Sequence, residues 1–313
     1  MKLPEKATKP TMYFIGVTTG KSSIMKIFPE WAKAMNLGDV EIKGIDIGIH
    51  APDEDYRKVV SFIKEDPLSM GALVTTHKID LFTACEDMFD YLDPYALTFG
   101  ELSSISKDGN KLMGHAKDPI TAGKAMDEFI PENYWVGNNK YACILGAGGS
   151  ALAIAAYLAH EKWGDNVPRR IIITNRSAPR LAESINRLAS EISVPLSFHL
   201  CPNAELNDRI VSKMLKGSLV VNATGLGKDR PGSPLTDECL FPKEALIWEI
   251  NYRGSLEFMH QAIGQQEKRK LIVEDGWSYF IYGWTEVIAE VFHIEISKET
   301  LQKCKEIAED YRA

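Results

Sequence analysis

The sequence lacks the features of secreted, membrane-spanning and metal-binding proteins. Its five cysteines are scattered, and none falls in a CxxC or Cys/His ligand spacing, so neither a disulfide framework nor a metal site is expected. No run of about 18 apolar residues is present that could cross a bilayer. The opening stretch MKLPEKATKP contains no apolar signal segment. We therefore expect a cytoplasmic protein that binds no membrane and no metal.

The sequence also has no excess of basic residues. The formal net charge is −7, and no Lys/Arg stripe with interleaved aromatic residues occurs, which argues against nucleic-acid binding. The chain has 313 residues and no internal repeat, so it is long enough for two globular domains. A homodimer is left open, because dimers are common among soluble enzymes and the sequence adds little to that expectation.

Strand and helix patterns alternate along the chain. The first third predicts strands at 11–17, 40–49 and 70–76 and helices at 23–35, 53–66 and 78–92. The stretch PENYWVGNNK, residues 131–140, is a junction rich in turn residues. Beyond it, strands are predicted at 141–146, 169–175, 218–224, 245–252 and 271–277, and helices at 150–163 and 179–192. This order predicts two α/β domains whose sheets contain parallel strands.

A glycine-rich turn joins the first strand and the first helix of the second half. Gly146, Gly148 and Ala151 match the pattern G-x-G-x-x-A. The first glycine allows a tight turn, the second lets a pyrophosphate approach the backbone, and the small third residue lets helix and strand pack closely. The phosphate charge then lies on the exposed N–H groups that begin the helix. The turn therefore predicts a dinucleotide site.

The end of the next strand distinguishes the two nicotinamide cofactors. NAD enzymes usually carry an Asp or Glu at this point, which bonds the ribose 2′-hydroxyl. Here Asn175, Arg176 and Ser177 occupy the position, and Arg180 follows one helical turn later. Guanidinium groups offer several N–H donors to phosphate oxygens, which suits a 2′-phosphate. We therefore expect NADP rather than NAD.

The cofactor segments ILGAGGSALA, TNRSAPR and VVNATGLG resemble, in order and spacing, those of the shikimate/quinate dehydrogenase superfamily. Upstream, GALVTTHKIDLF and GHAKDPITAG resemble its segments with a catalytic lysine and aspartate. Downstream, WEINYRGSLEFM and DGWSYFIYGWTEVIAEVF resemble its tyrosine-bearing segment and its C-terminal helix. The resemblance implies an α/β substrate domain at 1–125, completed by C-terminal helices in 276–313, and a Rossmann-type doubly wound NADP-binding domain at 126–275.

The resemblance also implies the residues of the site. Lys78 corresponds to the catalytic lysine and Asp118 to its carboxylate partner, an acid/base pair for reversible hydride transfer at a secondary alcohol. The implied substrate-binding residues are Ser22, Ser23, Thr75, Ser103, Tyr252 and Tyr282. The implied cofactor-binding residues are Gly146, Ala147, Gly148, Gly149, Ser150, Asn175, Arg176, Ser177, Arg180, Asn222, Ala223, Thr224 and Gly276. His77 is a rival acid/base, because an unperturbed histidine titrates nearer neutrality.

Some positions depart from the superfamily's pattern. Leu73 stands where an asparagine is usual, Ser103 and Ser104 replace an Asn-Thr pair, and Gly283 replaces a glutamine. A buried substrate hydroxyl that lost its partner would cost about 1–3 kcal/mol. We therefore expect a small-molecule substrate other than shikimate, such as a related cyclitol or hydroxylated keto acid.

Three alternatives stay open at this point. The first is an authentic shikimate dehydrogenase that reduces 3-dehydroshikimate. In that case the serines at the changed positions hydrogen-bond the substrate through a bridging water. The second is a regulator that binds NADP(H) without turnover, against which the retained Lys78 and Asp118 argue. The third is a folate-type dehydrogenase of similar build, although no pterin-binding pattern is present.

Overall fold

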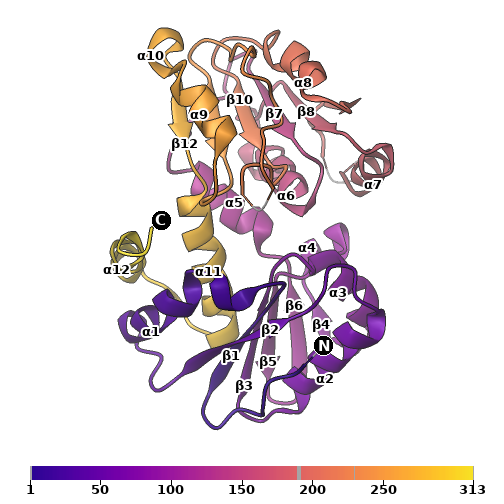
Figure 1. Cartoon of the computed structure of the whole chain (residues 1–313), viewed down its shortest axis with the longest axis vertical. Helices are drawn as coiled ribbons and strands as arrows, with labels where there is room; N and C mark the ends of the chain where they lie inside the picture. The colour runs from indigo at the N-terminus through magenta and orange to yellow at the C-terminus, as the bar shows by residue number, and fades with distance from the viewer. Residues whose placement is uncertain (1, 189–191, 229, 313) are drawn as a thin grey trace. The chain divides into compact units, whose positions relative to one another are not determined.

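The computed structural model describes residues 2–188, 192–228 and 230–312, and the chain folds as two compact units (Figure 1). Unit 1 consists of Met1–Lys117 and Gly283–Ala313, and unit 2 is Asp118–Tyr282. Both units are α/β. The C-terminal segment belongs to the unit that contains the N-terminus, as the resemblance implied. The expected fold class, an α/β domain followed by a Rossmann-type domain, is confirmed.

The sheet of unit 1 has the strand order β2-β1-β3-β5-β6-β4. The strands are β1 Thr11–Gly16, β2 Glu41–Asp46, β3 Ser69–Val74, β4 Tyr91–Leu92, β5 Ser104–Asp108 and β6 Lys111–His115. β1 is parallel to β2 and β3, whereas β5 is antiparallel to β3 and β6. The sequence predicted the first three strands. It did not predict β4 or the β5–β6 hairpin, which turns at Gly109 with φ +59°.

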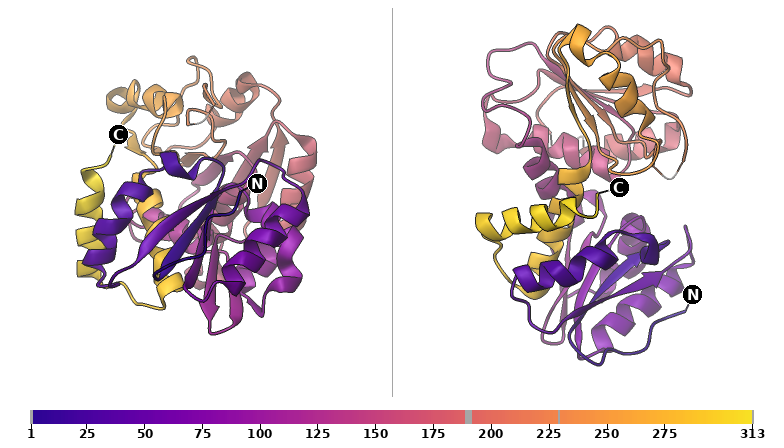
Figure 2. Two further views of the ribbon diagram at one scale, coloured as in Figure 1. Left: turned by 60° about the horizontal axis from the view of Figure 1, so that its bottom comes forward. Right: turned by 60° about the vertical axis from the view of Figure 1, so that its left-hand side comes forward.

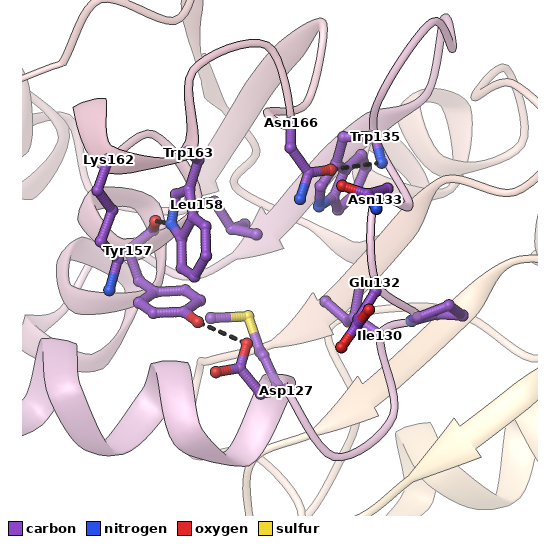
Figure 3. Close-up of a pocket in the computed structure, with 12 residues that line it drawn as sticks. Asp127, Ile130, Glu132, Asn133, Trp135, Tyr157, Leu158, Lys162, Trp163 and Asn166 are labelled. Atoms are coloured by element: carbon purple, nitrogen blue, oxygen red, sulfur yellow. Dashed lines mark hydrogen bonds between the residues drawn. The ribbon is translucent and has the colours of Figure 1, made fainter.

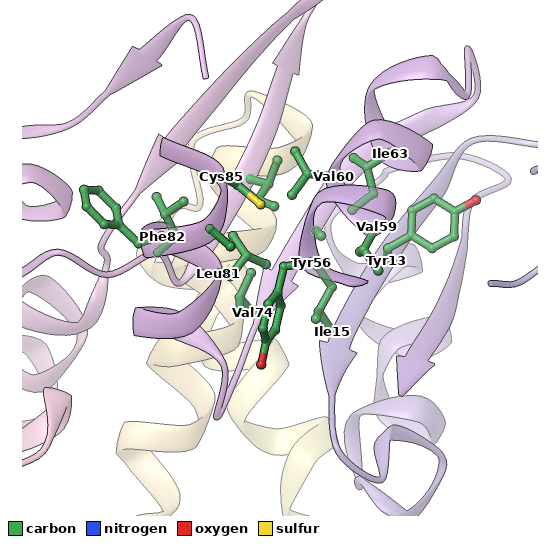
Figure 4. Close-up of a cluster of buried hydrophobic side chains, with 14 of the residues drawn as sticks. Tyr13, Ile15, Tyr56, Val59, Val60, Ile63, Val74, Leu81, Phe82 and Cys85 are labelled. Carbon is green, nitrogen blue, oxygen red and sulfur yellow. The ribbon is translucent and has the colours of Figure 1, made fainter. Parts of the chain in front are cut away.

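Helices α2 and α3 cover the core of unit 1. Tyr56 and Val59 of α2 and Leu81 of α3 are buried with Tyr13 and Ile15 of the sheet (Figure 4). The helices of this unit are α1 Ile24–Ala34, α2 Asp53–Glu65, α3 Lys78–Cys85, α4 Pro94–Phe99 and α12 Lys298–Glu309. The helix predicted at 78–92 is therefore shorter than expected, because a 3-10 turn and β4 follow it.

Helix α12 lies beside α1, and Figure 2 shows the two side by side in yellow and indigo. The indole Nε1 of Trp31 in α1 donates a hydrogen bond to the carbonyl oxygen of Cys304 in α12, at 2.8 Å. Trp31 and Cys304 are both fully buried. The contact anchors the C-terminal segment on the N-terminal half of unit 1.

The sheet of unit 2 has the strand order β12-β11-β10-β7-β8-β9, and each neighbouring pair is parallel. The strands are β7 Tyr141–Leu145, β8 Arg170–Asn175, β9 Leu196–Leu200, β10 Leu219–Asn222, β11 Leu246–Glu249 and β12 Ile272–Glu274. From β7, the chain adds β8 and β9 on one side and β10 to β12 on the other. This is the doubly wound order, whose crevice lies where the order reverses, beside β7 and β10. The sequence predicted all of these strands except β9.

The helices of unit 2 connect these strands. They are α5 Asp118–Met126, α6 Gly149–Leu158, α7 Ala178–Leu188, α8 Ala204–Val211, α9 Glu257–Ile263 and α10 Gln266–Arg269, and α11 Trp277–Phe292 begins in this unit and ends in unit 1. Residues 189–191 of the helix predicted at 179–192 lie outside the described residues. α5 packs on α6, where a Cβ on Gly123 would lie 2.1 Å from the Tyr157 ring.

Candidate functional site

The glycine turn between β7 and α6 has the geometry that a dinucleotide requires. Gly146 has φ +116°, and a Cβ there would lie 2.5 Å from the carbonyl oxygen of Ala223, so only glycine fits. No described atom lies within 4 Å of the place that a Cβ on Gly148 would take. Ala151 is fully buried in α6, as close helix–strand packing requires. The turn therefore presents uncovered backbone at the start of α6.

A cavity of about 550 Å³ opens beside this turn. Of the predicted cofactor residues, it is lined by Gly146, Ala147, Gly148, Asn175, Arg176, Ser177, Arg180, Ala223 and Thr224. Sequence reasoning missed Cys201, Asn203, Asn207, Leu226, Arg230 and Ser233, which also line it. Except for Leu226, which lies in the segment VVNATGLG, these residues belong to segments without a cofactor motif, and the parallel sheet brings those segments to the same edge.

The other predicted cofactor residues are not among those that line this cavity. Gly149 and Ser150 form the first turn of α6, and the Tyr279 hydroxyl donates to Ser150 Oγ at 3.5 Å. Asn222 is fully buried at the end of β10. Gly276 packs against the chain that follows β11, because a Cβ there would lie 2.0 Å from the carbonyl oxygen of Ile250.

The charged side chains that line the cavity are cationic. Arg176, Arg180 and Arg230 contribute to the wall, and its described residues include no Asp or Glu. Arg180 Nη1 also donates to Glu183 Oε2 at 2.7 Å, on the next turn of α7. At the end of β8, Asn175 Oδ1 accepts from the Arg176 N–H at 2.8 Å. The cavity therefore suits an anionic ligand and offers no carboxylate to a ribose 2′-hydroxyl.

In unit 1, Lys78 is the first residue of α3 and follows β3 after a short turn. Thr76 in this turn has φ +64°, a conformation that β-branched residues rarely adopt. Thr75 precedes it, and its N–H donates to the carbonyl oxygen of Ile15 at 3.0 Å. Ser22 and Ser23 are half-buried at the start of α1, beyond the same carboxyl ends of the strands. This edge of the sheet therefore brings four of the predicted residues onto one side of unit 1.

His77 is buried directly beside Lys78, with 1% of its surface exposed. Its Nδ1 lies 3.2 Å from the hydroxyl oxygen of Tyr56, and that hydroxyl also donates to Asp80 Oδ2 at 3.4 Å. His50 Nδ1 lies 3.1 Å from the same Asp80 oxygen. Burial lowers the pKa of His77 below its usual value. The ring therefore anchors the strained turn.

Ser103 is buried at the start of the β5–β6 hairpin. Its Oγ donates to the carbonyl oxygen of His115 at 3.3 Å and accepts from the N–H of Lys117 at 2.7 Å. Leu73 is paired with Ser104 across the antiparallel strands β3 and β5. The Ser103 hydroxyl is thus engaged by the backbone on both sides.

A largely buried ionic cluster lies at the end of β6, and no sequence motif indicated it. Lys117 Nζ pairs with Glu290 of α11, and His115 Nε2 lies 3.4 Å from the other Glu290 oxygen. Burial acts to raise the pKa of Glu290, but the hydrogen bond from Lys117 and the charge of His115 lower it below its usual range. The cluster fixes the backbone that leads to Asp118.

The remaining predicted residues belong to unit 2. Asp118 is buried at the first position of α5. Tyr252 is half-buried and stacks near Phe280, with ring centroids 4.4 Å apart. The Tyr282 hydroxyl donates to Glu128 Oε1 at 2.7 Å. Its phenol is therefore already engaged within this unit.

Unit 2 has a second hollow of about 480 Å³, between the chain after α5 and the end of α6 (Figure 3). The Tyr157 hydroxyl donates to Asp127 Oδ1 at 2.5 Å, and Trp163 Nε1 donates to the Tyr157 carbonyl oxygen at 2.8 Å. Asn166 Oδ1 accepts from the Trp135 N–H at 3.0 Å. The polar groups of this hollow therefore tie the connecting segments together.

Within residues 2–188, 192–228 and 230–312, no group of three or more His, Cys, Asp or Glu side chains is arranged to hold a metal ion. None of the helices in these ranges is both long enough and apolar enough to span a membrane.

The chain is similar to several known proteins, although no protein-family profile matches it. A shikimate dehydrogenase (NADP(+)) of Lactococcus lactis subsp. cremoris is 24% identical over 219 residues, which cover 67% of this chain and 72% of that protein. The structure is similar to shikimate 5-dehydrogenase from Listeria monocytogenes in complex with shikimate and NAD, with TM-score 0.73, 18% identity and coverage of 98% and 99% of the two chains. It is also similar to quinate dehydrogenase from Corynebacterium glutamicum in complex with NAD, with TM-score 0.71, 16% identity and coverage of 96% and 99%.

Proposed function

We propose that the chain is an NADP-dependent oxidoreductase of the shikimate/quinate dehydrogenase superfamily, to whose members it is similar in sequence and fold. It transfers hydride reversibly between the nicotinamide and a secondary alcohol or ketone of a small hydroxylated substrate, of shikimate-like or cyclitol-like structure. The observation that carries the proposal is the arginine-lined cavity beside the glycine turn of unit 2.

The residues around this cavity fit NADP(H). The open space at Gly148 admits a pyrophosphate, and the N–H groups at the start of α6 neutralise part of its charge. Arg176, Ser177 and Arg180 offer donors to the 2′-phosphate. When bound, the nicotinamide supplies the hydride acceptor or donor. The Lactococcus relative is named for NADP(+), which agrees with this assignment.

Lys78 and Asp118 are the proposed acid/base residues, assigned by their match to the superfamily's segments. Lys78 takes the hydroxyl proton when the alcohol is oxidised and returns it when the ketone is reduced. Asp118 is the proposed carboxylate of the pair and accepts hydrogen bonds from substrate hydroxyls. Ser22, Ser23, Thr75, Ser103, Tyr252 and Tyr282 are the proposed substrate contacts.

The proposed substrate differs from shikimate itself. Leu73 is apolar and buried, and Gly283 has no side chain where the superfamily carries glutamine. No described atom lies within 4 Å of a Cβ built on Gly283, so the position leaves room for a substituent. A site with fewer amide donors and more space favours a related polyol or hydroxylated keto acid.

The experiment is to follow absorbance of reduced nicotinamide with NADP⁺ and a panel of shikimate, quinate and cyclitols. We expect turnover of at least one member of the panel. Lys78→Ala should lower kcat by about 10²–10⁴-fold and leave NADPH affinity unchanged. Lys111→Ala, which changes an exposed lysine at the start of β6 in the same unit, is the matched control.

The outcomes separate the alternatives. Turnover of shikimate at an ordinary enzyme rate would identify an authentic shikimate dehydrogenase. Tight NADPH binding without turnover of any panel member, in either direction, would favour a regulator that senses NADP(H). Absence of NADPH binding by the unaltered protein would contradict the proposal as a whole.

A further inference from the structure

Three buried polar side chains meet at the carboxyl ends of β10 and β11, beneath the wall of the cavity. Asn222 is the last residue of β10, Glu249 is the last of β11, and Asn251 follows two residues later. Asn222 and Glu249 have no exposed surface, and Asn251 is 4% exposed. A buried carboxyl group in a sheet core is costly unless it is hydrogen-bonded, so its partners indicate why it is there.

Every described hydrogen-bond partner of the Glu249 carboxyl group is an N–H donor. Its Oε2 accepts from Asn222 Nδ2 at 2.7 Å, and its Oε1 accepts from the backbone N–H of Asn251 at 2.9 Å and from Asn251 Nδ2 at 2.6 Å. This set of donors matches an ionised carboxylate, which can accept hydrogen bonds but cannot donate them. A protonated carboxyl or a glutamine amide would direct a hydrogen toward one of these donors.

The carboxylate thereby sets the orientation of both asparagines, and they in turn fix the loop that follows β10. With its Nδ2 directed to Glu249, Asn222 presents Oδ1 to Thr224, accepting from the backbone N–H at 3.1 Å and from Oγ1 at 2.7 Å. The Nδ2 groups of Asn222 and Asn251 both donate to the carbonyl oxygen of Leu226, at 3.3 and 3.1 Å. Thr224 and Leu226 line the cavity.

We propose that Glu249 is a positioning residue for the dinucleotide: its buried carboxylate orients Asn222 and Asn251, which hold Thr224 and Leu226 in the cavity wall. The inference rests on the proposed function, because it concerns how the same cavity takes NADP(H). The loop also touches the glycine turn, since Ala223 provides the carbonyl oxygen that excludes a Cβ at Gly146. A change at Glu249 is therefore expected to affect both the loop after β10 and the glycine turn, and both line the cavity.

The electrostatics of Glu249 give the proposal a distinctive signature. Burial raises its pKa to about 7 although the three hydrogen bonds from Asn222 and Asn251 oppose the rise, and the nearby Asp275 carboxylate adds to it. The carboxyl group is therefore almost fully ionised at pH 8.5 and largely protonated at pH 6. Asp275 is the charged side chain that acts on it, and the groups that bond it from β10 and from the chain after β11 are uncharged amides.

The test is fluorescence titration of NADPH into the unaltered chain and into Glu249→Gln, between pH 6 and pH 8.5. We expect Glu249→Gln to weaken NADPH binding about tenfold at pH 8.5. The ratio of the two Kd values should shrink toward one at pH 6, because Glu249 then becomes protonated in the unaltered protein. Titration of the cofactor's own phosphate cancels in this ratio. Glu267→Gln, which removes an exposed carboxylate from α10 of the same unit, should bind like the unaltered protein.

Several results overturn the inference. A Kd ratio near one at pH 8.5 would mean that Glu249 does not position the wall, whereas a ratio that stays constant with pH would mean a purely structural role. If Glu249→Gln does not fold, Asn251→Ala is the alternative test. It removes the side-chain amide of Asn251 and with it the hydrogen bonds to the Glu249 carboxylate and to the Leu226 carbonyl oxygen. It should bind NADPH several-fold more weakly. Failure of the unaltered protein to bind NADPH would instead overturn the proposed function and this inference with it.

Discussion

The two sheets differ in how their carboxyl-end edges are built. In unit 2 the edge is shaped by backbone, through Gly146 and Gly148, and by a buried amide–carboxylate network around Glu249. In unit 1 the edge consists of side chains from separate segments, and Lys78 follows a turn strained at Thr76. A constant ligand such as a dinucleotide is recognised by backbone shape, which a short local motif encodes. A variable substrate is recognised by side chains, and these change without disturbing the fold.

Burial also acts oppositely on the buried groups of the two edges. Desolvation raises the pKa of Glu249 in unit 2 and lowers that of His77 in unit 1, because in both cases it disfavours the charged form. Folded Glu249 binds more protons than the unfolded chain at pH 4.5 to 7, so its contribution to stability falls as pH rises through that window. Folded His77 binds fewer protons than the unfolded chain below about pH 6.5, so its contribution falls as pH decreases.

The largest expected effect concerns the backbone surface of unit 2. Gly148→Ala adds a methyl group where the structure has open space, so the fold without ligand should keep its thermal midpoint. The same methyl group blocks the approach of a pyrophosphate, and NADPH affinity should fall by about 100-fold or more. Fluorescence titration measures this change. Gly48→Ala, at an equally open position in unit 1, is the control. Unchanged affinity in Gly148→Ala would show that the phosphates do not lie on this turn.

A smaller effect is expected at the charged side chains of the same cavity. The double variant Arg176→Ala/Arg180→Ala removes donors to the 2′-phosphate and should weaken NADPH binding by about 30-fold while NADH affinity stays the same. Arg170→Ala, at the opposite end of β8, is the matched control. Equal losses of affinity for both cofactors would mean that the arginines shape the cavity without binding the 2′-phosphate.

The opposite pH responses can be separated by paired variants. Urea unfolding of the unaltered protein, Glu249→Gln and His77→Gln is followed from pH 5 to pH 8. In Glu249→Gln the free energy of unfolding should no longer fall as pH rises from 5 to 7. In His77→Gln it should no longer fall as pH decreases below about 6.5. Identical pH profiles for all three proteins would remove the contrast between the two edges.

The smallest expected effect tests the anchor of the Lys78 turn. Tyr56→Phe removes the hydroxyl that lies against His77 and donates to Asp80. We expect a loss of about 1 kcal/mol in the free energy of unfolding, because one buried bonded group is left without its partner. Tyr91→Phe, with an exposed ring in the same unit, should have no effect. Equal stability of both variants would show that the Tyr56 hydroxyl does not brace the turn.

Most of the fold was predictable because periodicity and turn residues are local properties of the sequence. The β5–β6 hairpin was missed although its turn contains Asp108-Gly109, a common hairpin signal. β9 was missed because LSFHL is short and half exposed. The cavity lining was predicted where the glycine turn and the end of β8 carry motifs. Asn203 and Arg230 lie in loops without motifs, and only the order of the strands brings them to the same cavity.

The network around Glu249 could not be predicted from the sequence for a related reason. Asn222 and Glu249 are 27 residues apart, and their contact depends on the register of β10 and β11. The sequence also pointed to His77 as a rival proton carrier, because composition does not reveal burial. In the structure its ring is buried against Tyr56 of α2.

The most direct test of the account is the relative affinity of the unaltered chain for NADPH and NADH, measured by fluorescence titration at pH 8 and moderate ionic strength. The arginine-lined cavity predicts that NADPH binds at least about tenfold more tightly, because the 2′-phosphate finds Arg176 and Arg180 and no carboxylate among the described lining residues. Equal affinities, tighter binding of NADH, or no binding of either dinucleotide would contradict the account.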